Sequence, residues 1–383
     1  MRKKFLPVLM VLVGLMLSVG VQASEPPRAS LPDMTPYLDS IDTDRLRSQI
    51  PDQAQNMLEQ NGLDEIGTEG IASLTPAKLF AMAKNYIGGQ VRRPLASLST
   101  IAAIVILAAF LDGMKNAATD QSTLGPVFSL TSSLAVCAAI AGPVIGCITD
   151  TASAIRDSAN FMLSFVPVFS GVLTAGGQPL TATTYNIFLF WACQVVSQIT
   201  ATTIVPLMGI YLAFCIVAAA APGLGISSVA SMLKSLVNWA MGLMLTVFVS
   251  LLTIQSMVSS SGDTVTVKTA KFLIGSFVPV VGGALSDAFA TAQGCIHLLK
   301  TTLGAYGIIV SAVIALPTLL RVLLWYLTVN LSSVLSELLG LPSIGALLKS
   351  VSYTLGMLLA MLLCFALLII ISTSLIVVIG QGV

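Results

Sequence analysis

A succession of long apolar segments after Pro94 restricts the fold of this chain more than any other feature. A helix that crosses a membrane needs about 20 mostly apolar residues, and several such segments follow one another towards the C-terminus. Only 9% of the 383 residues are charged, against about 25% in a soluble domain. Since backbone groups in lipid must be paired internally, these lengths predict an all-α polytopic membrane protein with about 5–8 membrane segments.

Nine apolar segments are candidates for these membrane segments, and some of them are interrupted by proline or glycine. They are Leu95–Ala118, Val127–Ile148, Asn160–Gly177, Tyr185–Ile204, Pro206–Ala221, Leu236–Val258, Lys271–Ala292, Leu303–Leu327 and Tyr353–Ile379. We expect a break at Gly142-Pro143 and a hairpin joining the two segments that meet at Pro206. Residues 328–349 are less apolar and predict a pair of amphipathic or membrane-surface helices.

The N-terminal residues differ in composition from the rest. Residues 1–23 have a basic start, an apolar centre and the small-x-small sequence Val21-Gln22-Ala23, which is typical of a signal peptide or of an uncleaved anchor. Most acidic residues fall in the following segment, which has too few large apolar side chains to bury much core alone. We therefore predict three regions: a signal peptide (1–23), an exported helical region (24–93) and a polytopic membrane domain (94–383).

One ten-residue stretch occurs twice in the membrane domain. Ser164–Leu173 and Ser276–Leu285 both begin Ser-Phe-Val-Pro-Val and carry Gly and Leu at matched positions. A basic residue precedes each copy at the same distance, Arg156 and Lys268. Fixed offsets of Pro and Gly favour an internal duplication covering about 156–175 and 268–287, and the alternative is two unrelated spans that share a kink.

Proline and glycine in these copies predict irregular helices. Pro frees a backbone carbonyl and Gly weakens a helix, so we expect broken helices or re-entrant hairpins packed on protein or lining a cavity. Re-entrant copies would be inverted relative to each other, whereas spanning copies would be parallel. The candidate gate or broken-helix residues are Ser164, Pro167, Gly171, Ser276, Pro279, Gly282, Gly283 and Asp287.

No catalytic, cofactor or metal site is expected. The chain has one histidine, His297, with no Cys-x-x-Cys pair and no phosphate-binding Gly-Lys-Ser/Thr loop, so it does not read as an enzyme. A net charge of +1 gives no general attraction for nucleic acid. Asp150 and Arg321 are assigned to span ends, where snorkelling accounts for them. Asp287 either lines a polar path or caps the helix that follows.

The motifs resemble one known family. The Phe277–Gly282 motif with Ser286-Asp287-Ala288 after it, the Gly340-Leu341-Pro342 connector and the long last span are similar to stage III sporulation protein AE. The resemblance implies a membrane component of endospore-forming bacteria, in the mother-cell membrane around the forespore. Implied partners are other stage III sporulation A proteins, including a separate secretion-type ATPase and ring-forming components, and a forespore-side channel protein.

The function implied is that of a channel or export-gate subunit that supports forespore development and late gene expression, as a homo-oligomer in the lipid bilayer. Two alternatives stay open. Inverted repeats with unwound helices also suit a secondary transporter of a small solute, and a non-conducting scaffold of the complex needs no transport path.

Overall fold

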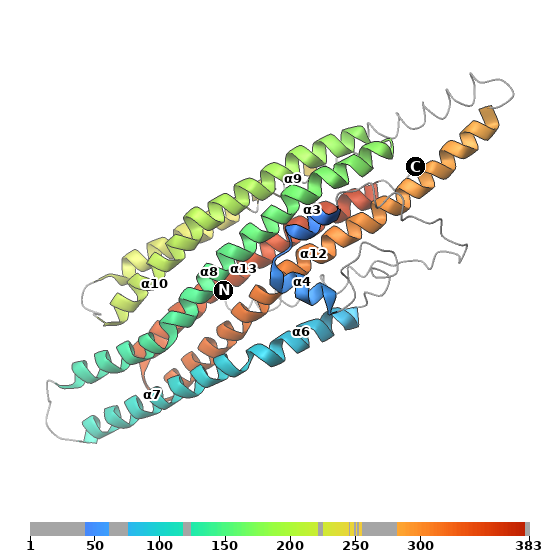
Figure 1. Cartoon of the computed structure of the whole chain (residues 1–383). Coiled ribbons are helices and arrows are strands. Elements are labelled where there is room, and N and C mark those ends of the chain that lie inside the picture. Colours follow the sequence, from blue (N-terminus) through green and yellow to red (C-terminus); the bar gives the residue numbers. More distant parts are fainter. Residues whose placement is uncertain are drawn as a thin grey trace.

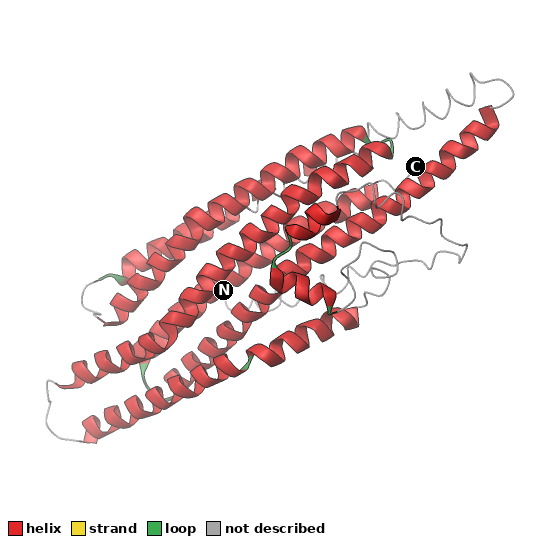
Figure 2. Cartoon of the chain, in the orientation of Figure 1, coloured by secondary structure: helices red, strands yellow, loops and turns green. Residues whose placement is uncertain are grey.

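Helices account for all regular structure in the described part of the chain. The computed structural model describes residues 43–60, 76–117, 124–220, 225–244, 246–248, 250, 253–254 and 282–379, and within these ranges every element is helical (Figure 2). The all-α prediction is confirmed. The predicted signal peptide and two members of the second motif copy, Ser276 and Pro279, lie outside the described residues.

The long helices run side by side in an elongated bundle (Figure 1). They are α7 (Arg92–Ala117), α8 (Leu124–Ala175), α9 (Pro179–Ile199), α10 (Val205–Ala220), α12 (Gly282–Leu338) and α13 (Pro342–Ile379). The most extensive packing joins α12 to α13, and both also pack on α8. These three helices form the centre of the bundle.

Six described helical stretches are long and apolar enough to cross a membrane. They are Arg92–Phe110, Leu130–Ala175, Pro179–Ala219, Ser227–Phe248, Gly294–Leu338 and Pro342–Ser374, which confirms a multi-pass architecture. Helices α8 and α12 have 52 and 57 residues, or about 78 and 86 Å. A hydrocarbon core is about 30 Å thick, so at ordinary tilt one bilayer covers about two-fifths of either helix.

The helix break expected at Gly142-Pro143 and the break expected in the first motif copy are both wrong. Helix α8 continues through Pro143 and Pro167 and joins two predicted segments into one. A proline inside a helix costs about 3 kcal/mol or more. Tertiary packing offsets that cost, because the side chains between Phe161 and Phe169 that face the bundle are buried while Pro167 faces outward.

The hairpin expected at Pro206 is also wrong. Helices α9 and α10 are joined in line by a π-helical turn, η1 (Thr200–Ile204). Pro206 has no N–H to donate, so the regular α-helical hydrogen-bond pattern would lose one bond there. The helix instead widens by one residue: Val205 N–H donates to the Thr200 carbonyl five residues back. The chain therefore continues in the same direction.

Residues 328–349, predicted as a pair of surface helices, are the end of α12, a short turn and the start of α13. Gly340 has φ of 76°, and Leu341 N–H donates to the Ser336 carbonyl at 3.0 Å, as in a Schellman cap. Pro342 then begins α13, since proline suits the first helical turn. The turn from α8 to α9 repeats this Gly-x-Pro arrangement at Gly177 and Pro179.

An aromatic row on α8 anchors the centre of the bundle. The rings of Phe161, Phe165 and Phe169 stack at centroid distances of 5.7 and 5.5 Å, and Tyr185 of α9 meets the last ring edge-on at 5.5 Å. All four side chains are fully buried. Facing them, a β-carbon added at Gly307 of α12 would lie 2.2 Å from the Phe165 ring. The first motif copy thus supplies a close helix contact.

Tyr185→Phe should lower the free energy of unfolding by about 1 kcal/mol. The substitution removes the hydrogen bond between Tyr185 Oη and Thr373 Oγ1, 3.3 Å long and buried, but keeps the ring against Phe169. Thermal unfolding of the purified protein in detergent measures the change. Combining it with Thr373→Val should add little further loss, and full additivity of the two would contradict a shared hydrogen bond.

Short N-terminal helices pack on the bundle. Helix α4 (Asp52–Glu59) and α6 (Pro76–Gln90) contact α12, and α3 (Thr43–Ser48) contacts α8. Their apolar side chains Leu46, Ile50, Ala54 and Leu58 are at most 5% exposed. The region that is too small to form its own core therefore completes one with the membrane domain.

Candidate functional site at the centre of the bundle

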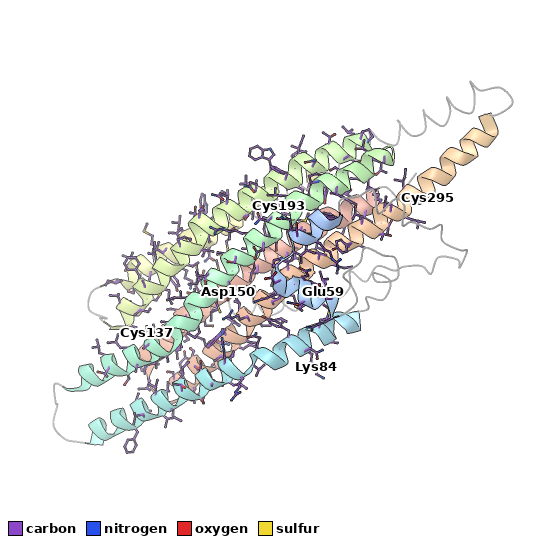
Figure 3. All side chains as sticks on the ribbon, in the orientation of Figure 1. Glu59, Lys84, Cys137, Asp150, Cys193 and Cys295 are labelled. Carbon is purple, nitrogen blue, oxygen red and sulfur yellow. The ribbon has the colours of Figure 1, made fainter. Side chains whose placement is uncertain are left out.

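An ion pair joins the two longest helices, at the midpoint of α8 and about two-thirds of the way along α12. Arg321 of α12 donates through Nη1 to Asp150 Oδ2 of α8 at 2.5 Å. Asp150 lies near the midpoint of α8 (Figure 3). Both residues belong to apolar stretches long enough to cross a membrane. Charges at such positions are costly unless paired, and they commonly mark a transport path or a functional site.

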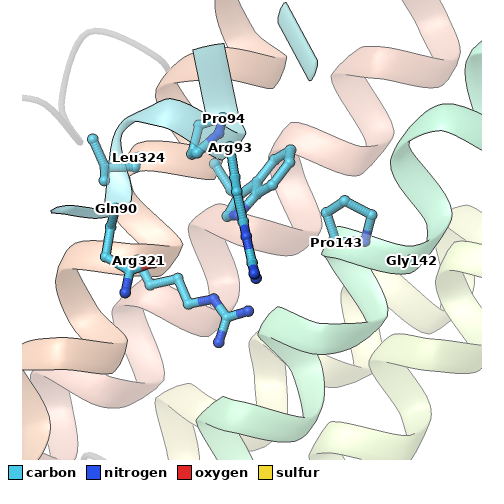
Figure 4. Close-up of a pocket in the computed structure, with 8 residues that line it drawn as sticks. Gln90, Arg93, Pro94, Gly142, Pro143, Arg321 and Leu324 are labelled. Carbon is cyan, nitrogen blue, oxygen red and sulfur yellow. The ribbon is translucent and has the colours of Figure 1, made fainter. Parts of the chain in front are cut away.

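A pocket opens beside the ion pair, with a volume of about 250 Å³. Helix α6 contributes Gln90, α7 contributes Arg93 and Pro94, α8 contributes Gly142 and Pro143, and α12 contributes Arg321, Leu324 and Trp325. The guanidinium groups of Arg93 and Arg321 point into the same space between the helices (Figure 4). The lining has two cationic groups and no carboxylate, so it favours an anion.

Helix α6 brings a phenol close to this charged layer. Burial raises the pKa of the Tyr86 hydroxyl, the positive charge of Arg321 lowers it in part, and the negative charge of Asp150 raises it again. The phenol is therefore neutral near pH 7. It can donate or accept a hydrogen bond near the ion pair without adding charge.

Hydroxyl side chains are buried along the α12–α13 interface. Most bond to a carbonyl one turn back in their own helix, as Ser332 does to Thr328 at 2.9 Å, and Ser333 reaches the Gly345 carbonyl of α13 at 3.4 Å. Four buried hydroxyl oxygens have no hydrogen-bond partner among the described residues: Ser133, Ser336, Ser372 and Ser374. Unpaired hydroxyls cost about 1–3 kcal/mol each, so these sites are candidates for water or for a polar path.

The sequence-predicted site residues that the structure describes fall into two groups, away from the ion pair. Ser164, Pro167 and Gly171 lie in α8, where Ser164 is half-buried and the other two are on the exposed face. Gly282, Gly283 and Asp287 lie in the first two turns of α12. The structure therefore places the first copy's Pro and Gly on the outside of this bundle.

Sequence reasoning missed the pairing of Asp150 with Arg321. The sequence assigns each to a span end: Asp150 lies just beyond the expected segment Val127–Ile148, and Arg321 lies near the end of Leu303–Leu327. The available signal was charge inside apolar sequence, but two residues 171 positions apart reveal their pairing only when α8 and α12 pack together. All six cysteines are free, and the described residues contain no group of three potential metal ligands.

The described fold and this charged layer define a multi-pass helical membrane protein with a charge pair between two of its long helices. A family model described as stage III sporulation protein AE matches residues 61–380. The chain belongs to the stage III sporulation protein AE family, as the motif resemblance predicted, and this membership supports a role in sporulation.

A relative in Bacillus subtilis (strain 168) is named stage III sporulation protein AE. It is 24% identical to this chain over 289 residues, which cover 74% of this chain and 72% of the relative. No solved structure matches the chain.

Proposed function

We propose that the chain is the membrane-embedded channel or export-gate subunit of a sporulation complex that links the mother cell with the forespore. The proposal places it in the mother-cell membrane around the forespore, with its N-terminal region exported. It acts there as a homo-oligomer and supports forespore development and late gene expression.

The observation that carries this proposal beyond family membership is the Asp150–Arg321 pair between α8 and α12, within apolar stretches long enough to cross a membrane. A protein that only anchors others has no need for a charge pair within its apolar membrane stretches, whereas a conduit needs a polar path through apolar surroundings. The pair's position beside an open pocket supports the same reading. The length of α8 and α12 relative to one bilayer suits a component that reaches beyond its own membrane.

The proposal gives this subunit no chemical reaction of its own. A separate secretion-type ATPase of the stage III sporulation A set would supply energy, ring-forming components would extend the conduit, and a forespore-side channel protein would meet it. Co-purification of the full-length protein from sporulating cells tests these partners. Recovery of the chain without any of them would argue against the assembly.

Pro167→Ala provides a direct test of the gate. The substitution restores one backbone donor and stabilises α8 by up to about 3 kcal/mol, so protein level and oligomer size should stay unchanged. If bending at Pro167 gates the conduit, expression of a late forespore reporter and passage of a small fluorescent tracer should fall at least about tenfold, a barrier change of about 1.4 kcal/mol.

The matched control is Ile145→Ala, which also changes an exposed position on α8, 54% exposed. This variant should leave both readouts unchanged. Normal sporulation and tracer passage in Pro167→Ala would argue against gating at this proline and would leave it a packing role only.

A secondary transporter is the second candidate, because an intramembrane acid–base pair also suits ion-coupled transport. The two functions differ in assembly. Reconstituted monomers that accumulate a solute against its gradient when an ion gradient is imposed would support the transporter. A closed ring of subunits around a continuous pore would support the channel.

A further inference from the structure

We propose that the pocket between α6, α7, α8 and α12 is a binding site for a phosphate group, supplied by the headgroup of an anionic phospholipid. The inference concerns the pocket's own chemistry and stands whether or not the chain conducts. In the channel proposal the pocket only indicates a polar region, whereas here it has a specific class of ligand.

The charged side chains of the pocket favour an anionic ligand. Arg93 and Arg321 both line the pocket, and no carboxylate does. Asp150 neutralises Arg321 through its Nη1, whereas Arg93 has no carboxylate partner within the part of the chain that the structure describes. A guanidinium group binds phosphate oxygens through two parallel N–H donors, and no described carboxylate competes with a phosphate for those of Arg93.

The neutral residues of the lining combine hydrogen-bond donors with apolar surface. Gln90 offers an amide that can donate to a phosphate oxygen, and the indole N–H of Trp325 is a further donor. Pro94, Pro143 and Leu324 supply apolar surface around them. A site that combines donors with apolar walls fits a headgroup attached to a glycerol and acyl chains better than it fits a small hydrated ion.

The pocket lies at the start of the membrane-crossing stretch of α7. Arg93 stands at the start of the membrane-crossing stretch Arg92–Phe110 of α7, and the apolar sequence follows directly. The Arg93 side chain is exposed, whereas Trp325 is nearly fully buried at 5% exposure. Basic side chains collect at the level of the headgroups, so a lipid phosphate next to the start of α7 lies within reach of Arg93.

Lipid binding to the purified full-length protein tests the proposal. Native mass spectrometry would count phosphatidylglycerol retained from mixed micelles that contain equal amounts of phosphatidylcholine. Arg93→Gln should weaken retention of phosphatidylglycerol about tenfold, equivalent to about 1.4 kcal/mol. The control is Arg92→Gln, which removes the neighbouring exposed arginine outside the pocket and should change retention less than about twofold, equivalent to about 0.4 kcal/mol.

Other arms separate the sources of the phosphate. Arg93→Lys keeps the charge but not the paired donors and should bind with intermediate strength. Equal losses in Arg92→Gln and Arg93→Gln would overturn the proposal, because they would indicate general attraction of anions. Arg93-dependent binding of inorganic phosphate without retention of phosphatidylglycerol would overturn the lipid assignment in favour of a free phosphate.

Discussion

Gly307→Val is expected to prevent normal assembly of the helix bundle. A β-carbon at this position would lie 2.2–2.6 Å from three atoms of the Phe165 ring, well inside van der Waals contact. The ring cannot move aside easily, because it is stacked between Phe161 and Phe169. Overpacking a rigid core costs about 1–3 kcal/mol and sometimes more. We expect valine at this site to be more destabilising than alanine, because it is larger.

The measurement is the amount of folded protein in the membrane and its thermal unfolding after solubilisation. Gly171→Ala is the matched control in α8, because a β-carbon there meets no atom within 4 Å. That variant should be neutral or more stable by up to about 1 kcal/mol. If Gly171 serves as a gating hinge, the control would retain its fold and lose function, which separates packing from gating.

A compensating change makes the test specific. Combining Gly307→Val with Phe165→Ala removes the ring that the valine meets, so the double variant should be more stable than additivity of the two single changes predicts. Strict additivity would show that the glycine is required for another reason. Wild-type stability of Gly307→Val alone would show that α8 and α12 do not approach this closely.

Removing one member of the Asp150–Arg321 pair should have the second largest effect. Arg321→Gln leaves the Asp150 carboxylate unpaired within an apolar bundle, and Asp150→Asn leaves the guanidinium unpaired. Breaking a fully buried pair costs about 3–5 kcal/mol. These side chains are 39% and 34% exposed, so we expect a loss between those of a buried and an exposed pair, about 2 kcal/mol for either single variant.

A double-mutant cycle measured by thermal unfolding in nanodiscs isolates the interaction. Asp150→Asn with Arg321→Gln should recover most of the loss, since neither charge then remains unpaired. The Glu337–Lys349 pair at the α12–α13 turn is the control, with side chains 42% and 46% exposed. Glu337→Gln should cost less than about 1 kcal/mol. Equal effects at the two pairs would contradict a special role for the central one.

Local sequence was sufficient to predict several features of the fold. The apolar lengths required helices, because lipid offers no partner for backbone groups. The Gly-x-Pro sequences at Gly177 and Gly340 indicate a helix end followed by a helix start, since glycine adopts positive φ without a clash and proline suits a first helical turn. The motif around Pro279 and Asp287 was sufficient to indicate the family.

Packing decided whether each proline ends a helix. Sequence analysis predicted a break near Pro143 and in the first motif copy, and a hairpin at Pro206. Each was wrong, because a single proline costs only a few kcal/mol and burial of a whole helix face outweighs it. The inward face of α8 holds Phe161, Phe165 and Phe169 in contact with neighbouring helices, and this contact is invisible to local propensity.

The sequence by itself determined the membrane environment and the helical class, because both depend on the length of apolar runs along the chain. Only the tertiary structure decided that Asp150 meets Arg321, that Gly307 admits the Phe165 ring and that Arg93 shares a pocket with Trp325. Such contacts join helices distant in sequence, and their energies arise from shape and charge across a helix interface. No pattern within one helix specifies its partner's register.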